Sequence, residues 1–415
     1  MKRRDFIVAA GGVAAASAAA AASAATTSSK PCPPPSLGIQ GGPSVNTVCS
    51  SDGTAPTWFA NMPDKTWLAP VSNWLGAVKD PLADTLNHGN TGHSSLVVAW
   101  TGMGADQTRK TLFLLGSGGH NDYYGNEVYS CDLSQATPAW KRRRNASAAT
   151  GSPASVAKFL DGRKSSDHTT QLQIEAGGRW FSAGMASTNY LGSANYRQWW
   201  EYNLSTEDYI DRYNANYAAG ALSVAGLAVY DPTDRQIITI HTGNAVPAMQ
   251  FVDLDTLNVA LNINSPTFNA SNSLNAAIDT DRHLLLVRQD DTCFIYNLAN
   301  KTAAPTTITS SGTGPERRCA LHYHPASRAF LTWDGGTTVR KLTPTISGNS
   351  YTALAWSSVS PASGNPVTPP GSAMNGMYNK VQMIRDMGNG QAALVVLPTY
   401  SNPDIFLFKV PAAGV

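Results

Sequence analysis

A strand–turn–strand unit at residues 112–133, reading LFLLGSGGHNDYYGNEVYSCDL, constrains the fold more than any other stretch of this chain. Residues 112–115 form a continuous apolar run, which predicts a buried strand. Gly118 and Gly119 then predict a tight turn where a Cβ atom would clash, and a polar loop follows. Residues 127–133 alternate in polarity and predict a second strand. The fold prediction therefore depends on whether the chain repeats this unit.

The unit does recur, six times from residue 94 onward, at intervals of roughly 40–75 residues. Each copy has an inner strand, a tight Asp/Pro/Gly turn, a central apolar strand and a further strand in the style of FIYNL. The inner strands are predicted within SSLVVAW, HTTQLQI, LSVAGLAVYDP, SLNAAIDT, RCALHYHP and YNKVQMIRD. Repeated short strands with turn signals predict an all-β fold, a single β-propeller rather than a sandwich. The order strand, Gly-Gly, polar loop, strand and Trp140 resembles one blade of a kelch-type propeller.

The number of blades is six or seven, depending on the N-terminal segment. Residues 58–68, WFANMPDKTWL, have the aromatic spacing of an edge strand. This segment is expected either to build a seventh blade or to complete the sixth by pairing with the C-terminal blade.

Residues 1–25 are interpreted as a targeting segment. Arg3 and Arg4, followed by one spacer residue and Phe6, resemble the bacterial twin-arginine signal, and an Ala-rich stretch with small-residue cleavage choices follows. We therefore expect export to the periplasm or the cell exterior. Residues 26–56 are expected to be a flexible Ser/Pro/Gly-rich leader and residues 57–415 the propeller domain.

The charge of the chain excludes some partners. Charged residues make up 14% of the chain, well below the roughly 25% of an average domain, which suits a secreted, turn-rich protein. Removing residues 1–25 takes away Lys2, Arg3, Arg4 and Asp5, so the formal charge falls from +2 to 0. A neutral protein has no bulk attraction to nucleic acid or anionic membranes, so we expect neither partner, and a monomer. An anionic ligand must be held by a local cluster of cations.

The five cysteines fit no zinc signature. In an oxidising compartment Cys32 and Cys49 are the expected disulfide. Cys293 and Cys319 lie in adjacent predicted blades, which leaves a second pairing open, and Cys131 is expected to be buried and free.

Three histidines lie where predicted strands open onto one face of the ring. His93 opens the first inner strand, His120 ends the adjacent central strand, and His168 opens the next inner strand. Two successive blades would therefore aim them at a common patch. A histidine at such a position also serves simply to hydrogen-bond backbone between blades, so the cluster, more than any single member, indicates a site. The same loops carry further candidate side chains: Asn121, Tyr123, Tyr124, Arg163, Tyr190 and Arg197.

The motifs GHSSLVV, GSGGHNDYYGNEVYSCDL and DGRKSSDHT resemble those of secreted bacterial kelch-type proteins. More distantly, they resemble β-propeller polysaccharide lyases, the ulvan lyases and rhamnosyl-glucuronate lyases. The resemblance implies catalytic roles for His93 and His120, with His168 where the lyases often have Tyr. It implies Arg197 or Arg163 as the cation. The insertion at residues 102–110 departs from the pattern because it lengthens the gap between His93 and His120.

The resemblance implies β-elimination on uronate-containing glycans, so an anionic polysaccharide or oligosaccharide is the expected partner. A guanidinium pairs with the uronate carboxylate and stabilises the enolate. One His or Tyr removes the C5 proton and a second group protonates the leaving oxygen. His168 or Tyr190 is expected as the base, and His120 or Tyr124 as the acid. Tyr123, Tyr124, Arg163 and Asn121 are expected to bind substrate.

Other functions stay open at this point. No cofactor is expected, although three imidazoles also suit zinc or copper, and calcium is left open. Hydrolysis by paired carboxylates has less support, since no facing pair is evident. The alternative to a lyase is a non-catalytic carbohydrate- or protein-binding propeller, with Trp199 and Trp200 as candidate stacking platforms.

Overall fold

The structure is a computed structural model. It describes residues 54–82, 92–98, 101–116, 125–147, 161–164, 171–185, 197–212, 226–242, 247–268, 274–315, 319–371 and 377–415. These residues all belong to one compact unit, Thr47–Val415. No helix among them is long and apolar enough to cross a membrane.

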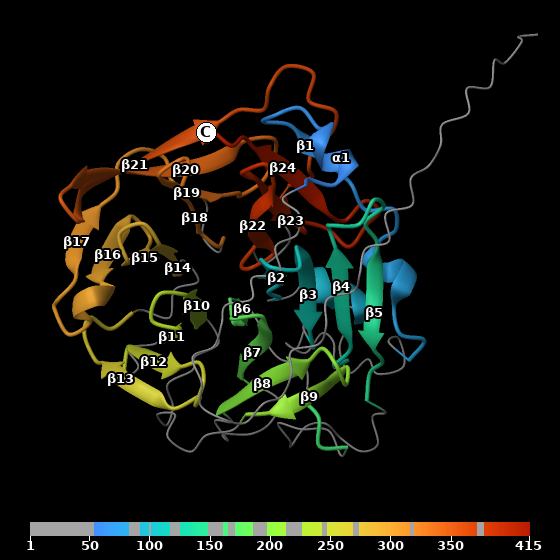
Figure 1. The fold of residues 1–415 in the computed structure, drawn as a ribbon, viewed down its shortest axis with the longest axis horizontal. Coiled ribbons are helices and arrows are strands. Elements are labelled where there is room, and N and C mark those ends of the chain that lie inside the picture. The colour runs from blue at the N-terminus through green and yellow to red at the C-terminus, as the bar shows by residue number, and fades with distance from the viewer. Residues whose placement is uncertain are drawn as a thin grey trace, which may run out of the picture. The chain divides into compact units, whose positions relative to one another are not determined.

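The described strands form six four-stranded antiparallel sheets, which are the blades of a propeller (Figure 1). The innermost strands β2, β6, β10, β14, β18 and β22 contact one another in this order, and β22 contacts β2 again. The ring is therefore closed with six blades, which confirms the predicted all-β propeller and decides its blade number.

The first three blades have these strands, from the inside outward: β2 (Gly104–Asp106), β3 (Thr111–Leu115), β4 (Val128–Asp132), β5 (Trp140–Arg144); β6 (Gln173–Ala176), β7 (Arg179–Met185), β8 (Arg197–Asn203), β9 (Asp208–Asp211); β10 (Leu227–Asp231), β11 (Gln236–Ile240), β12 (Met249–Asp253), β13 (Val259–Ile263). The last three have these: β14 (Asn275–Asp279), β15 (Leu284–Gln289), β16 (Thr292–Asn297), β17 (Thr306–Thr309); β18 (His322–His324), β19 (Ala329–Thr332), β20 (Val339–Ser347), β21 (Ser350–Val359); β22 (Val381–Gly388), β23 (Gln391–Val396), β24 (Phe406–Val410), β1 (Trp67–Leu68). The helical segments are short: α1 (Thr57–Ala60), η1 (Leu75–Val78), η2 (Gly92–Ser94), α2 (Ser95–Val98) and η4 (Leu298–Asn300).

The N-terminal strand β1 closes the ring by completing the sixth blade, as the alternative with six blades predicted. Trp67 pairs with Phe408 of β24, and its buried indole donates to the carbonyl of Thr337 at 2.8 Å. Trp58, at the other end of the predicted edge strand, lies in helix α1 instead.

The first inner strand differs from the prediction. The segment SSLVVAW contributes helix α2, and strand β2 lies within residues 102–110, which the sequence pattern treated as an insertion. Leu96 and Val97 are apolar because they are buried in the core shared by the first and last blades. Gly104 faces the Phe113 ring so closely that a Cβ would lie 2.0 Å from it. A three-residue strand reading GAD has no apolar periodicity by which it could be found.

Buried aspartates fasten neighbouring blades at the ends of inner strands. Asp106 accepts a hydrogen bond from the Trp180 indole at 2.7 Å, and Asp231 bonds His283 Nε2 at 2.8 Å. Each carboxylate also accepts a backbone N–H from its own turn. Each aspartate thus fixes its turn and the contact between blades together.

None of the described cysteines forms a disulfide. Cys131, Cys293 and Cys319 are buried thiols, so the pairing of Cys293 with Cys319 that the sequence left open is not formed. The two lie in different apolar clusters. Cys131 is free as predicted, and Cys32 and Cys49 lie outside the described residues.

Candidate active site on the loop face

Loops between second and third strands, and loops between blades, open on the same face of an antiparallel propeller, named the loop face here. Hydrogen bonds across two blades follow this arrangement. Gln173, the first residue of β6, donates to the carbonyl of Leu115, the last residue of β3, at 3.3 Å and accepts its N–H at 3.1 Å. Of the predicted site residues that the structure describes, His93 and Arg163 lie in connections between blades.

His93 lies in η2 on the loop face, not at the start of an inner strand, and is 2% exposed. Its Nδ1 is 2.6 Å from the hydroxyl of Tyr400, which lies between β23 and β24. Its Nε2 is 2.8 Å from the hydroxyl of Tyr129 on β4. The last and first blades thus place one imidazole between two phenols.

The surroundings of Tyr129 allow the tautomer of His93 that carries its proton on Nε2. The Tyr129 oxygen accepts the backbone N–H of Asp80 at 3.3 Å, and its proton is directed to Glu127 Oε1 at 3.5 Å. Burial, followed by the charge of Glu127, raises the pKa of Tyr129, so this phenol stays protonated. In that tautomer His93 Nε2–H donates to Tyr129, and Nδ1 accepts the proton of Tyr400.

Tyr400 is the member of this group that reaches solvent, since it is half-buried whereas His93 and Tyr129 are buried. The half-buried ring of Trp74 meets it edge to face at 5.1 Å. Gly76 of η1 makes room for both, because a Cβ there would lie 2.4 Å from Trp74 and 2.8 Å from the Tyr400 hydroxyl.

Arg142 supplies a cation beside this group. It lies opposite Tyr129 in the β4–β5 register, and its charge lowers the pKa of Tyr129 against the larger effect of burial. Its guanidinium donates to the carbonyl of Val78 and to Asn145 Oδ1, both at 2.8 Å. Within the described residues it has no carboxylate partner. The group Tyr400–His93–Tyr129 can therefore move a proton next to a positive charge.

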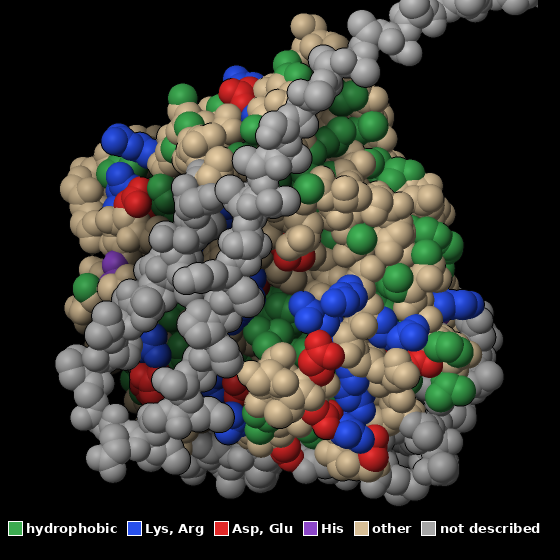
Figure 2. All heavy atoms as spheres, turned by 45° about the vertical axis from the view of Figure 1, so that its right-hand side comes forward, with side chains coloured by type: hydrophobic (Ala, Val, Ile, Leu, Met, Phe, Trp, Pro, Cys, Tyr) green, Lys and Arg blue, Asp and Glu red, His purple; other side chains and the backbone are tan. Residues whose placement is uncertain are grey.

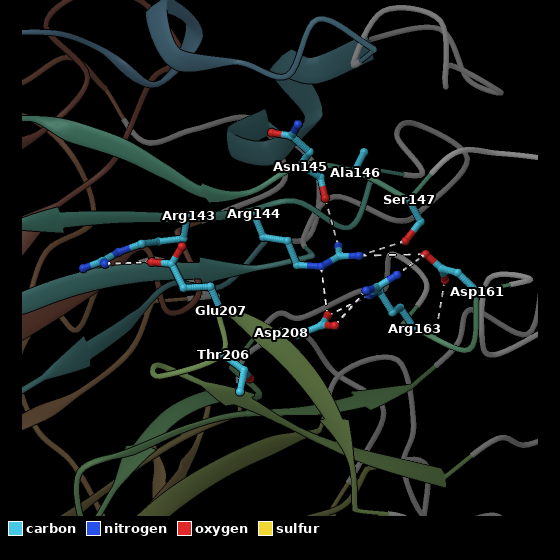
Figure 3. A pocket seen from close by; sticks show the side chains of 10 residues that line it. All are labelled: Arg143, Arg144, Asn145, Ala146, Ser147, Asp161, Arg163, Thr206, Glu207 and Asp208. Carbon is cyan, nitrogen blue, oxygen red and sulfur yellow. Dashed lines mark hydrogen bonds and ion pairs between the residues drawn. The ribbon is translucent and has the colours of Figure 1, made fainter. Parts of the chain in front are cut away.

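A second feature of this side of the molecule is a hollow of about 590 Å³ between β5 and the β8–β9 turn. Figure 3 shows its arginines turned toward carboxylates. Arg163 bonds both oxygens of Asp208, at 2.7 and 2.8 Å, and also Asp161, at 2.9 Å. Arg144 reaches Asp208 at 3.1 Å, and Arg143 reaches Glu207 at 3.1 Å.

These pairs neutralise the hollow. The Arg163 hydrogen bonds hold the pKa of Asp208 at about 2 despite partial burial, and the pKa of Arg163 is raised in return. Three arginines face three carboxylates, and Figure 2 shows both signs of charge interspersed on this surface. Arg163 therefore lies among cations, but each of these cations already has an anionic partner. Tyr400 and His93 are the better candidates for chemistry among the described residues.

The described ends of two predicted site loops meet beside the hollow. Lys164 Nζ donates to the carbonyl of Gly116 at 3.0 Å, and Asn126 Nδ2 donates to the carbonyl of Lys164 at 2.7 Å. Gly116 precedes residues 117–124 and Lys164 precedes residues 165–170. The chain therefore enters both loops at one place on the loop face.

The other predicted residues lie outside the described residues and stay predictions: His120, Asn121, Tyr123, Tyr124, His168 and Tyr190. Arg197 begins β8, but its side chain is not among those described. Trp199 and Trp200, the candidate stacking platforms, are 1% and 2% exposed and pack inside the protein, so neither offers a face to a sugar. Tyr129 and Tyr400 were missed. Tyr400 could have been found, since it lies after a central strand of the blade that ring closure brings beside His93.

Three potential metal-ligand side chains also cluster at the edge of blade 3. Asp231, Asp234 and His283 hold their donor atoms within 4.8 Å of one another. Asp231 bonds a side chain of the next blade, His283, as Asp106 bonds Trp180, and Lys301 bonds Asp234 at 2.5 Å. The cluster is therefore better explained as a contact between blades.

No protein-family model matches the chain, and no curated protein matches it. Solved structures match at low identity. The structure of YjhT is 10% identical with a TM-score of 0.41, covering 74% of this chain and 96% of its own. The Dos1 propeller is 11% identical with a TM-score of 0.35, covering 74% and 66%. The dihydro-heme d1 dehydrogenase NirN in complex with DHE is 12% identical with a TM-score of 0.36, covering 75% and 55%. Likeness at this level says nothing of activity, and the assignment of the fold as a six-bladed propeller rests on the sheets described above.

Proposed function

We propose that this propeller is a secreted polysaccharide lyase, cleaving uronate-containing glycans by β-elimination on its loop face. One observation carries the proposal. The half-buried hydroxyl of Tyr400 lies 2.6 Å from His93 Nδ1, and the tautomer with the proton on Nε2 leaves Nδ1 able to take the Tyr400 proton. A phenol that can pass its proton to a neighbouring imidazole becomes a phenolate, and this phenolate is a general base open to solvent.

The proposed reaction begins when Tyr400 gives its proton to His93 Nδ1. The phenolate takes the C5 proton of the uronate, and the C5–H electron pair moves into the enolate of the carboxylate. The enolate then expels the glycosidic oxygen at C4, which takes a proton from a general acid, and an unsaturated uronate results. His93 then gives up its extra proton, which restores the acid through solvent. Arg142 is the proposed cation for the carboxylate, because charge stabilisation at the enolate is the largest need of this step.

Residues of three segments that are not described, 117–124, 165–170 and 186–196, together with Arg197, are the proposed partners of this base; the chain enters the first two segments beside Lys164. His120 and His168 are candidates for the acid that protonates the leaving oxygen, with Tyr190, Arg197, Asn121, Tyr123 and Tyr124 as substrate contacts. The twin-arginine pattern at Arg3 and Arg4 supports export to the periplasm or beyond, where such polymers are found. An anionic polysaccharide and a monomeric enzyme belong to the same proposal.

Absorbance near 235 nm, which reports the unsaturated uronate, tests the proposal on a panel of uronate polysaccharides. Tyr400→Phe keeps the ring against Trp74 and removes the proton-transfer group, so we expect kcat to fall about 10²–10⁴-fold. Tyr296→Phe is the matched control, because that buried hydroxyl in blade 4 has no hydrogen-bond partner. His120→Ala runs in parallel. Full activity in Tyr400→Phe would refute the assignment of the base.

A non-catalytic glycan-binding propeller is the second candidate, favoured by the half-buried edge-to-face pair of Trp74 and Tyr400. Aromatic rings of this kind stack on sugars. Polysaccharide retention in affinity electrophoresis, lost in Trp74→Ala, with no absorbance at 235 nm on any polymer, would establish this function in place of the lyase.

A further inference from the structure

Arg288, on β15 in blade 4, is a buried cation with no carboxylate partner among the described residues. It is 3% exposed, and its Nε and Nη1 have no hydrogen-bond acceptor. Within the described residues no ion pair reaches it, and the Asp334 carboxylate of the next blade is engaged by Arg340 at 3.1 Å. Breaking a buried ion pair by removing one member is strongly destabilising, so an arginine in this state calls for an anion.

A second unsatisfied donor lies beside it. Trp356, on β21 of blade 5, is 6% exposed and its indole Nε1 also lacks an acceptor. The Arg288 guanidinium lies over this ring, 5.1 Å from its centroid. The two donors thus come from neighbouring blades (Figure 1).

Gly314 borders both donors. A Cβ on Gly314 would lie 3.0 Å from Trp356 Nε1 and 3.1 Å from Arg288 Nη2. Its φ is not among the positive values, so the need for glycine here is spatial, not conformational. Ser311, Gly312 and Thr313, just before it, are exposed, so solvent lies close to the position where the donors meet.

We propose that Arg288, Trp356 and Gly314 form a binding site for a small oxoanion, named the Arg288 site. The group offers only donors, and the edge of an arginine formed by Nη1 and Nη2 binds two oxygens of one anion; Nη1 lacks an acceptor and Nη2 borders Gly314. The indole N–H supplies a third hydrogen bond. The Arg288 charge also lowers the pKa of the buried Cys293 and Cys319 thiols against the larger effect of burial, which places the guanidinium beside both. This site does not depend on the lyase proposal.

Thermal unfolding of the full chain with acetate, glucuronate, sulfate or phosphate, at constant ionic strength, tests the site. At about a hundredfold excess over Kd we expect Tm to rise by about 3–5 °C. Acetate and glucuronate carry a planar carboxylate, whereas sulfate and phosphate are tetrahedral. Comparing the Tm shifts of the two pairs therefore shows which anion geometry the site binds. Arg288→Met removes the buried charge and keeps an unbranched side chain, so it should fold and lose the shift. Arg340→Met, which loses an ion pair in blade 5, should keep it.

Two further variants address the geometry. Trp356→Phe keeps the ring but removes one donor, and we expect Kd to rise roughly tenfold. Gly314→Ala removes no donor and fills the space between them, so binding should weaken as well. An anion response that persists in Arg288→Met would overturn the proposal. Glu316 follows Gly314 by two residues. An anion response that is absent in the wild type and appears only in Glu316→Gln would also overturn the proposal, because the wild-type site would then bind the Glu316 carboxylate and not a free anion.

Discussion

The position of the Tyr400 hydroxyl is controlled by a residue without a side chain. Gly76 lies in η1, and a Cβ there would lie 2.4 Å from Trp74 Cζ3 and 2.8 Å from Tyr400 Oη. Leu75, its neighbour, is held by a hydrogen bond from its N–H to Asp404 at 2.7 Å. The backbone therefore has little freedom to move away, and the two rings must shift instead.

Gly76→Ala should therefore displace Tyr400 from His93. A misplacement of about 1 Å is expected to lower kcat by about 10²-fold, with a small change in Tm because no core contact is lost. Steady-state kinetics at 235 nm together with thermal unfolding would show it. Gly371→Ala is the control, since nothing lies within 4 Å of a Cβ there. Equal kcat values for both variants would contradict this account.

The buried thiols give a prediction at the same scale. Burial raises the pKa of Cys293 to about 12 and of Cys319 to about 11, and Cys131 is raised by burial as well. We expect these three to resist a thiol reagent in the native protein. In urea without reductant at least three thiols per chain should react, as counted by mass spectrometry of the labelled peptides. Fewer than three would mean that a disulfide has formed among them.

At the scale of elements, the two-residue strand β1 carries the closure of the ring. The buried Trp67 contacts Trp333 and Phe408, and its backbone N–H donates to Asn365 at 2.7 Å. Lys409 of β24 donates from the same side to the carbonyls of Phe59 and Met62. One short strand thus joins the N-terminal segment, blade 5 and blade 6.

Trp67→Ala should lower the free energy of unfolding by about 3–5 kcal/mol, because it leaves a cavity and an unsatisfied carbonyl at Thr337. Equilibrium unfolding in urea measures this loss. Trp58→Ala is the comparison, since Trp58 is half-buried and lies in α1 beside the same strand. A loss for Trp67→Ala no larger than for Trp58→Ala would mean that β1 is not needed to close the ring.

The sequence predicts those strands that have a recognisable apolar or aromatic pattern. The inner strands of blades 3 to 6 follow from apolar runs that end at turns, and the closing strand follows from its aromatic spacing. Strand β2 could not be found, since Gly104–Asp106 is chosen for close packing under Phe113 and not for periodicity. The site was predicted in part for a related reason. His93 was identified, but its partner Tyr400 lies 307 residues away and meets it only because the ring closes.

At the scale of the whole molecule, the blades are joined by buried ionisable groups whose pKa values differ between the folded and unfolded chain. Asp404 accepts from Leu75 and from the Trp140 indole, and burial raises its pKa to about 6. Lys380, at the start of β22, donates to the carbonyl of Val97, and burial lowers its pKa to about 7. Stability should therefore depend on pH in two opposite directions.

The signs follow from proton binding. Asp404 has a folded pKa above its unfolded value of about 4, so its contribution is complete below pH 4 and is lost as pH rises through 6. Lys380 has a folded pKa below its unfolded value of about 10.4, so stability is gained as pH rises from 7 toward 10. Burial also raises the pKa of Glu175, to about 7. Its contribution to stability is therefore lost as pH rises, like that of Asp404.

We therefore expect Tm to fall between pH 4 and pH 7 and to recover between pH 7 and pH 8.5. Asp404→Asn keeps an acceptor for the Leu75 N–H and should reduce the fall, by on the order of 2–3 kcal/mol for a shift of about two pKa units. Lys380→Met should remove the recovery and leave the fall unchanged. Calorimetry of the three proteins at half-unit pH steps separates the two effects. Identical profiles for wild type and both variants would show that neither group changes its pKa on folding.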